Sequence, residues 1–239
     1  MRQLSFIEQQ FPVARVSAES YKERMAGAGS SQTLTGIGKW WGRKPLVLVR
    51  ACLLGMLLPA TNNPKRDREV FLKLMTMDEE GLWRRKRKLI DQDALETLLT
   101  EQERRKWLRD ELGEPKTRWS TGLTAGERNL VQRLAFDRMN YDEKLDYCLR
   151  PEQIEGPSEA AWADINQHLG TSVTALPELV SELGTRLFGH VPRVGDPVCG
   201  GGSIPFEAAR IGFSAYASDL SPVAALLTWG ALNLVGGDS

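Results

Sequence analysis

The sequence predicts an α/β fold, in which an incomplete, doubly wound parallel sheet carries a large, mainly helical, charged insertion. Residues 190–239 alternate short strand candidates, at 192–196 and 213–219, with two helical stretches. Alternation at these lengths is typical of the opening of a parallel sheet. Residues 61–189 are rich in charge, have few β-branched clusters and show helical periodicity. These two observations together predict the fold class.

Composition divides the chain into three segments, residues 1–60, 61–189 and 190–239. In the first, Pro45 can begin a helix, and apolar residues recur at helical spacing until Pro59 ends the run. In the third, Ser221 at the N-cap, followed by a proline, marks the start of the last helix.

Charge and cysteine usage exclude several classes of protein. Lys and Arg number 31 and Asp and Glu number 31, so any contact with nucleic acid must come from local patches. The three cysteines are dispersed and only two histidines are present, so we expect no metal site, no disulfide framework and a cytoplasmic location. The longest apolar stretch, 46–58, contains Arg50 and is shorter than the roughly 20 residues that span a bilayer, so we expect no membrane contact.

A glycine run lies where the first strand candidate of residues 190–239 turns into a helix, within VGDPVCGGGSIPFEAARIGFSAYASDL. Gly200, Gly201 and Gly202 allow a ligand to approach the backbone closely. Asp219 lies at the end of the second strand candidate, about 20 residues beyond the first acidic position, which is the spacing of a carboxylate that holds ribose hydroxyls. This pattern predicts a ligand that contains adenosine.

The residues around the glycines distinguish between ligands of this class. A triphosphate loop needs Lys and then Ser or Thr after its last glycine, whereas Ser203 and Ile204 follow here, and the dinucleotide pattern G-x-G-x-x-G is also incomplete. Asp196 opens the loop; its charge would repel a pyrophosphate but attract the ammonium of a methionine moiety. S-adenosylmethionine satisfies all three observations.

The segment DPVCGGGS resembles the DPF-x-GSG cofactor motif of DNA methyltransferases that modify exocyclic amino groups. The longer stretch DPVCGGGSIPFEAARIGFSAYASDLSPVAALLTWGALN is similar to large bacterial and archaeal adenine-specific methylases. Those proteins carry an N-terminal domain of unknown function, often lie in phage-defence loci and commonly contain a zinc ribbon later in the chain. The resemblance includes KWWGRKPLVLVRACLLGMLLPA, HLGT and PELVSELGTRLFG.

The resemblance implies an incomplete class I, Rossmann-like, S-adenosylmethionine-dependent methyltransferase sheet. It also implies that Asp196 and Gly200–Gly202 hold the methionine part of the cofactor, that Asp219 holds the ribose and that Leu220 flanks the adenine. Pro197 and Cys199 belong to the same motif. Lys44 and Pro45 match a K-P-x-x-L motif that begins a helix and helps to close the cofactor pocket.

The family's chemistry depends on a [DNS]-P-P-[YFW] motif that holds the target amino group and stacks on the flipped base. This sequence contains no Pro-Pro dipeptide, so we expect no catalytic residue. The resemblance then implies the cofactor-binding half of an adenine-specific enzyme that acts on double-stranded DNA with a C-terminal catalytic half or other defence-system subunits. The alternatives are a non-catalytic S-adenosylmethionine- or DNA-binding module of a phage-defence system, or a remnant that binds no ligand.

Several residues allow a structural and a functional interpretation. Cys199 lacks a basic partner in sequence, which favours packing over a nucleophilic role. Trp40, Trp41, Arg43 and Lys44 are compatible with a ligand pocket and equally with a half-buried helix entry. The basic runs at 84–88 and 103–107 could follow phosphates, but interspersed acids favour a solvated amphipathic helix, and both histidines favour structural roles.

Overall fold

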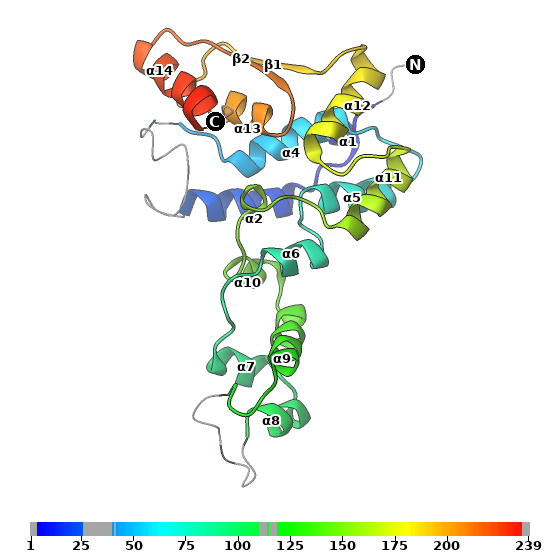
Figure 1. Ribbon diagram of the computed structural model, residues 1–239, viewed down its shortest axis with the longest axis vertical. Coiled ribbons are helices and arrows are strands. Elements are labelled where there is room, and N and C mark those ends of the chain that lie inside the picture. Colours follow the sequence, from blue (N-terminus) through cyan, green and yellow to red (C-terminus); the bar gives the residue numbers. More distant parts are fainter. Residues whose placement is uncertain (1–3, 26–39, 41, 110–113, 115–118, 236–239) are drawn as a thin grey trace. The chain divides into compact units, whose positions relative to one another are not determined.

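The computed structural model describes residues 4–25, 40, 42–109, 114 and 119–235 (Figure 1). Contacts divide the chain into two compact units. The first unit comprises residues 1–78 and 150–239, and the second unit comprises residues 79–149. Both boundaries lie inside the segment 61–189 that composition groups together, so helices from that segment contribute to the core of the first unit.

The first unit consists mainly of helices, of which the longer ones pack around a shared apolar core. In chain order its elements are α1 (Phe6–Gln9), α2 (Val13–Met25), α4 (Leu46–Leu57), α5 (Pro64–Leu74), η1 (Pro151–Gln153), α11 (Glu159–Leu169), α12 (Leu176–Phe188), β1 (Arg193–Asp196), α13 (Ser203–Arg210), β2 (Ser214–Ala217), α14 (Pro222–Gly230) and a π-helical turn, η2 (Ala231–Val235).

The predicted fold class is wrong. Among the described residues the sheet has only two strands, β1 and β2, which run parallel with Val194 opposite Ala215 and are joined through α13. The strand–helix alternation of residues 190–239 is present, but it does not extend into a Rossmann-like sheet. Both strands pack against α13, and α13 packs against α4. The other apolar segments of this unit form helices because their periodicity is helical.

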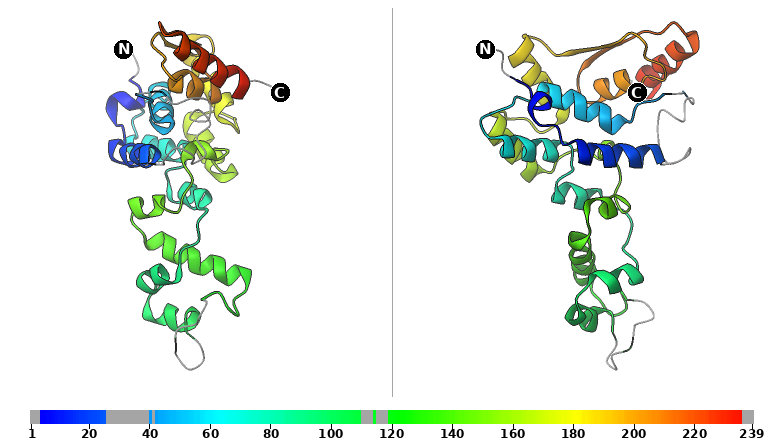
Figure 2. Two further views of the ribbon diagram at one scale, coloured as in Figure 1. Left: turned by 90° about the vertical axis from the view of Figure 1, so that its left-hand side faces the viewer. Right: turned by 180° about the vertical axis from the view of Figure 1, so that it is seen from behind.

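Helix α4 lies at the centre of the first unit. It contacts α1, α2, α12 and α13, and its position between α2 and α13 is visible in Figure 2. Val47, Ala51 and Leu54 are fully buried, and most other side chains of the helix are nearly so. A helix that is apolar on every side is typical of a core element, so the predicted apolar run at 46–58 forms the core of this unit.

A buried carboxylate from α2 caps the start of α4. Glu23 accepts hydrogen bonds from the backbone amides of Leu46, at 2.8 Å, and Val47, at 3.1 Å. Burial, followed by the nearby charge of Glu152, raises the pKa of Glu23 even though both amides favour its ionised form. The first-turn amides and the helix dipole together stabilise negative charge here, so Glu23 fixes where α4 begins.

A buried ion pair joins α4 to α13. Arg50 Nε donates to Glu207 Oε1 at 2.6 Å, and Arg210 Nη2 lies 2.8 Å from Glu207 Oε2. Arg50 Nη1 also donates to the carbonyl oxygen of Pro151 at 3.3 Å. Burial raises the pKa of Glu207, while the two guanidinium groups oppose that effect. The charges are therefore compensated inside the core, where an unpaired charge would be strongly unfavourable.

Helices α5 and α11 are joined by charged side chains at the edge of the core. Asp164 of α11 pairs with both Arg66 and Lys73 of α5. His168 Nε2 lies 2.7 Å from Asp67 Oδ1, and Asp67 also accepts from the backbone amide and the hydroxyl of Thr61 at 2.7 Å. His168 therefore sits in a structural cluster with an aspartate.

The regular elements of the second unit, within its described residues, are helices: α6 (Glu79–Arg85), α7 (Gln92–Leu98), α8 (Glu101–Trp107), α9 (Ala125–Arg138) and α10 (Tyr141–Leu145). Three of these helices begin with a capping box, in which Thr100, Thr124 and Asn140 each pair with a glutamate three residues later. No helix in the described part of either unit has the length and apolar character needed to cross a membrane.

Removing Arg50 should destabilise the first unit. We expect Arg50→Ala to lower the free energy of unfolding by about 3 kcal/mol, because Glu207 stays buried with only one of its two guanidinium partners. Arg105→Ala is the matched control, since Arg105 forms an exposed pair with Glu101 and its loss should lower the free energy of unfolding far less. Urea denaturation measures both. Equal losses would show that the buried pair contributes no more than a surface one.

Candidate functional site

The glycine loop, residues 197–202, connects β1 to α13. Two backbone hydrogen bonds shape it: the Cys199 amide donates to the Ser218 carbonyl oxygen at 3.0 Å, and the Gly202 amide donates to the Cys199 carbonyl oxygen at 2.9 Å. Gly202, the N-cap of α13, has a φ of +77°, and a Cβ there would lie 2.8 Å from Thr228 Oγ1. Only glycine fits this position without strain or a clash.

Asp219 ties the end of β2 to the glycine loop. Its Oδ2 accepts from the Gly200 amide at 2.8 Å, and its Oδ1 accepts from the Ser221 amide at 2.9 Å. These amides, Ser221 first and then Gly200, lower the pKa of Asp219. The carboxylate therefore stays ionised and holds the loop; its role toward a ribose stays a prediction.

A pocket of about 330 Å³ lies between the glycine loop and the residues that precede α4. The segment that precedes α4, comprising Trp40 and residues 42–44, is called the entry segment here. The pocket is lined by Trp40, Gly42, Arg43, Lys44, Asp196, Val198, Cys199, Gly200, Gly201, Ser203 and Ile204. The structure thus brings two distant parts of the sequence to one site.

Five of the residues predicted to bind a cofactor line this pocket, namely Lys44, Asp196, Cys199, Gly200 and Gly201. The other five, Pro45, Pro197, Gly202, Asp219 and Leu220, are not among its lining residues. Of these, Leu220 is fully exposed and Asp219 is engaged with the loop backbone. Trp41 lies outside the described residues.

Trp40 packs directly on the backbone of the glycine loop. A Cβ on Gly201 would lie 2.9 Å from Trp40 Cβ, and a Cβ on Gly200 would collide with the indole nitrogen. Gly200 also has a φ of +53°, in the left-handed region. The glycines therefore permit the close approach of an aromatic side chain from the entry segment, in addition to the turn itself.

Cys199 is buried beside Thr228 of α14. Its sulfur lies 3.2 Å from Thr228 Oγ1, and that hydroxyl also donates to the Gly200 carbonyl oxygen at 3.3 Å. Ser203, Ile204 and Thr228 were not singled out as site residues from the sequence. Thr228 has no sequence signal, because its approach to the loop depends on how α14 packs.

The charges around the pocket have both signs. Asp196 supplies a carboxylate, which accepts from the Val198 amide at 3.2 Å, while Arg43 and Lys44 supply cations. Burial lowers the pKa of Arg43, and the negative charge of Glu23 opposes that effect. Such a pocket can bind a ligand that carries both an ammonium and an anionic group. Among the described residues, no cluster of His, Cys, Asp and Glu has the geometry of a metal site.

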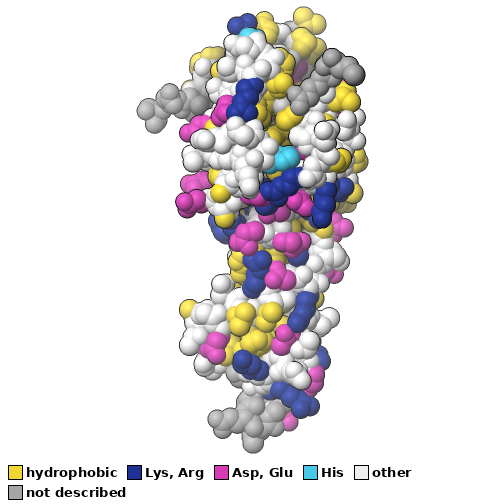
Figure 3. Space-filling model, turned by 90° about the vertical axis from the view of Figure 1, so that its right-hand side faces the viewer, with side chains coloured by type: hydrophobic (Ala, Val, Ile, Leu, Met, Phe, Trp, Pro, Cys, Tyr) yellow, Lys and Arg dark blue, Asp and Glu magenta, His cyan; other side chains and the backbone are white. Residues whose placement is uncertain are grey.

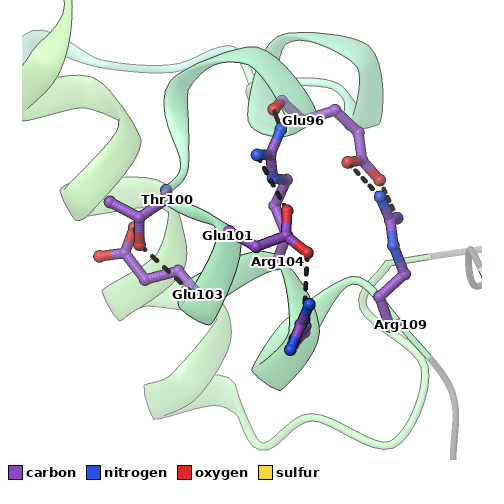
Figure 4. A network of polar contacts seen from close by, with 7 residues as sticks. Glu96, Thr100, Glu101, Glu103, Arg104 and Arg109 are labelled. Carbon is purple, nitrogen blue, oxygen red and sulfur yellow. Dashed lines mark hydrogen bonds and ion pairs between the residues drawn. The ribbon is translucent and has the colours of Figure 1, made fainter. Parts of the chain in front are cut away.

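The basic runs of the second unit are engaged largely within that unit. Arg85 Nε donates to the Leu149 carbonyl oxygen at 2.7 Å, and Lys86 Nζ donates to Gln132 Oε1 at 2.9 Å. Figure 4 shows Glu101 beside Arg104, and Glu96 paired with Arg109. Glu101 also pairs with Arg105. On the face drawn in Figure 3, Lys and Arg side chains lie among Asp and Glu side chains. This arrangement is that of a solvated, ion-paired surface.

A model of the family DUF1156, described as a protein of unknown function, matches residues 10–74. The matched region contains α2, α4 and α5, together with Lys44 and Pro45. Neither the comparison with curated proteins nor that with solved structures gives a match. The family match covers well under half of the chain and includes the entry segment but not the glycine loop.

Gly201→Ala tests the contact between Trp40 and the loop. We expect this variant to lose about 1–3 kcal/mol of unfolding free energy, because the new methyl group would press on Trp40 Cβ. Gly126→Ala in α9 is the matched control; its Cβ meets nothing within 4 Å, and we expect it to gain up to about 1 kcal/mol. Urea denaturation of both variants should show opposite signs, and a neutral Gly201→Ala would contradict the contact.

Acid should weaken the second unit as Glu103 is protonated. Hydrogen bonds from Arg138, first, and then from Thr100 lower the pKa of Glu103 to about 2. A depressed folded-state pKa contributes stability above the unfolded value of 4.5, and this contribution is lost as pH falls toward 2. We expect Arg138→Leu to return the pKa of Glu103 toward 4.5 in a carboxyl NMR titration, and Arg105→Leu to leave it unchanged. An unchanged pKa in Arg138→Leu would refute this pairing.

Proposed function

We propose that the pocket between the entry segment and the glycine loop binds S-adenosylmethionine. We further propose that the chain is the cofactor-binding part of an enzyme that methylates the exocyclic amine of adenine in double-stranded DNA. The observation that carries the proposal is the pocket itself, which unites Lys44 with Asp196 and the glycines. Lys44 belongs to one motif of the sequence, and Asp196 and the glycines belong to another. The two motifs are far apart along the chain, so only the fold brings them to one pocket.

The chemistry of the pocket suits this ligand. Asp196 can accept hydrogen bonds from the methionine ammonium, and the glycines allow the ligand to approach the backbone closely. Trp40, Val198 and Ile204 supply apolar surface for the uncharged parts of the nucleoside. The pocket volume of about 330 Å³ falls at the lower end of the range of about 300–1,000 Å³ for small-molecule sites.

Asp219 is compatible with a ribose contact although both of its oxygens accept backbone amides. Each carboxylate oxygen has a second lone pair, so a ribose hydroxyl can donate to Asp219 without displacing the Gly200 amide. In this proposal Asp219 has two roles: it accepts hydrogen bonds from the loop backbone, and it accepts a hydrogen bond from the ribose of the ligand.

The family match supports the proposal indirectly. The methylases that this chain resembles carry an N-terminal domain of unknown function, and residues 10–74 match a family described in those terms. A cytoplasmic location belongs to the same proposal, because the three dispersed cysteines suit a reducing compartment.

One observation favours a second candidate, a non-catalytic S-adenosylmethionine- or DNA-binding module of a phage-defence system. No Pro-Pro dipeptide occurs in the 239 residues, so the motif that holds the target amine is not in this sequence. Methyl transfer then requires residues from a catalytic half or another subunit. Incubation with methyl-labelled S-adenosylmethionine and double-stranded DNA distinguishes the candidates, since labelling of DNA by this chain alone would exclude the purely binding role.

Calorimetric titration tests cofactor binding. We expect wild-type protein to bind S-adenosylmethionine and not ATP or NAD, and Asp196→Asn to bind S-adenosylmethionine about tenfold more weakly because a charge-assisted hydrogen bond to the ammonium is lost. Asp93→Asn, an exposed change in the second unit, should leave the affinity unchanged. Absence of binding by wild-type protein, or binding of ATP in its place, would refute the proposed ligand.

A further inference from the structure

Ser203 carries a hydroxyl for which the fold provides no partner. Its side chain is buried, with 4% relative exposure, and it lines the pocket. Among the described residues, Ser203 Oγ has no hydrogen-bond partner. Buried hydroxyls are nearly always paired, so a lone one at a pocket wall points to a group that arrives with a ligand.

The start of α13 offers a second feature at the same place. Helix α13 runs for eight residues from Ser203, and its N-cap Gly202 has no side chain with which to cap it. The first amides of a helix lack intrahelical partners and favour an anion. The start of α4 is different, because the Glu23 carboxylate already accepts from its first amides.

Charge identifies the kind of anion. Lys44 and Arg43 line the pocket together with Ser203, which favours a negative ligand group. Asp196 lines it as well, and its carboxylate disfavours a phosphate with two negative charges. A ligand end that carries one carboxylate and one ammonium satisfies both sets of groups, and this is the head group of an α-amino acid.

We infer that Ser203 Oγ and the first amides of α13 bind the α-carboxylate of the ligand, with Lys44 balancing its charge, while Asp196 binds the α-ammonium. This inference rests on the proposed function and deepens it, because it makes Ser203 the residue that distinguishes S-adenosylmethionine from nucleosides without the carboxylate. The pocket is then selective for an intact amino-acid head group, in addition to the adenosine.

The test compares S-adenosylmethionine with decarboxylated S-adenosylmethionine, which lacks only the carboxylate. We expect wild-type protein to prefer the intact compound by at least about tenfold in calorimetric titrations. Ser203→Ala should lose most of this preference by weakening intact S-adenosylmethionine alone, and Ser203→Thr, which keeps a hydroxyl, should restore it. Ser17→Ala, at an exposed serine of α2 outside the pocket lining, is the matched control and should behave as wild type.

Stability gives a second readout. Because Ser203 Oγ has no partner in the fold, Ser203→Ala should unfold at the same urea concentration as wild type or at a higher one. A clear loss of stability in Ser203→Ala would show that the hydroxyl has a structural partner in the fold, and this would overturn the inference. It is equally overturned if wild-type protein binds both compounds with the same affinity, or if Ser203→Ala weakens both alike. Failure of wild-type protein to bind either compound would refute the proposed function together with the inference.

Discussion

The buried pairing of Arg50 with Glu207 is the constraint on which the candidate site depends. The two residues are 157 positions apart, and their side chains meet at 2.6 Å inside the core. Separating α4 from α13 would leave a charge in an apolar interior, which is far less favourable than keeping the pair. The entry segment leads directly into α4, and the glycine loop leads directly into α13. Since helices are stiff over one or two turns, fixing their contact also fixes the two walls of the pocket.

Within those walls, glycine conformation and one aspartate determine the shape of the site. Gly200 and Gly202 adopt left-handed backbone, and Asp219 accepts the Gly200 amide, so the turn between β1 and α13 has a defined form. The same absence of side chains lets Trp40 lie against the loop. The loop glycines are therefore required both for the backbone conformation of the turn and for the contact with Trp40. A substitution at one of these glycines affects both.

The local elements were predictable from the sequence, but their assembly was not. Strand and helix boundaries in residues 190–239 follow from periodicity and capping, as does the helix after Pro45. The predicted sheet was wrong because the other described elements of the chain are helices, so no further described strand extends β1 and β2. Arg50 appeared in the sequence only as an interruption of an apolar run, since its partner is too distant for any local pattern to indicate. The orphan hydroxyl of Ser203 likewise depends on tertiary packing that no spacing encodes.

The central claim is that the entry segment and the glycine loop form one ligand site. Hydrogen exchange with and without S-adenosylmethionine tests it most directly, because exchange reports protection along the chain. The account predicts slower exchange on ligand addition in two separate regions, the amides around 42–46 and those around 198–204, with no change in residues 79–149. Protection confined to one of the two regions, or found only in the second unit, would contradict it.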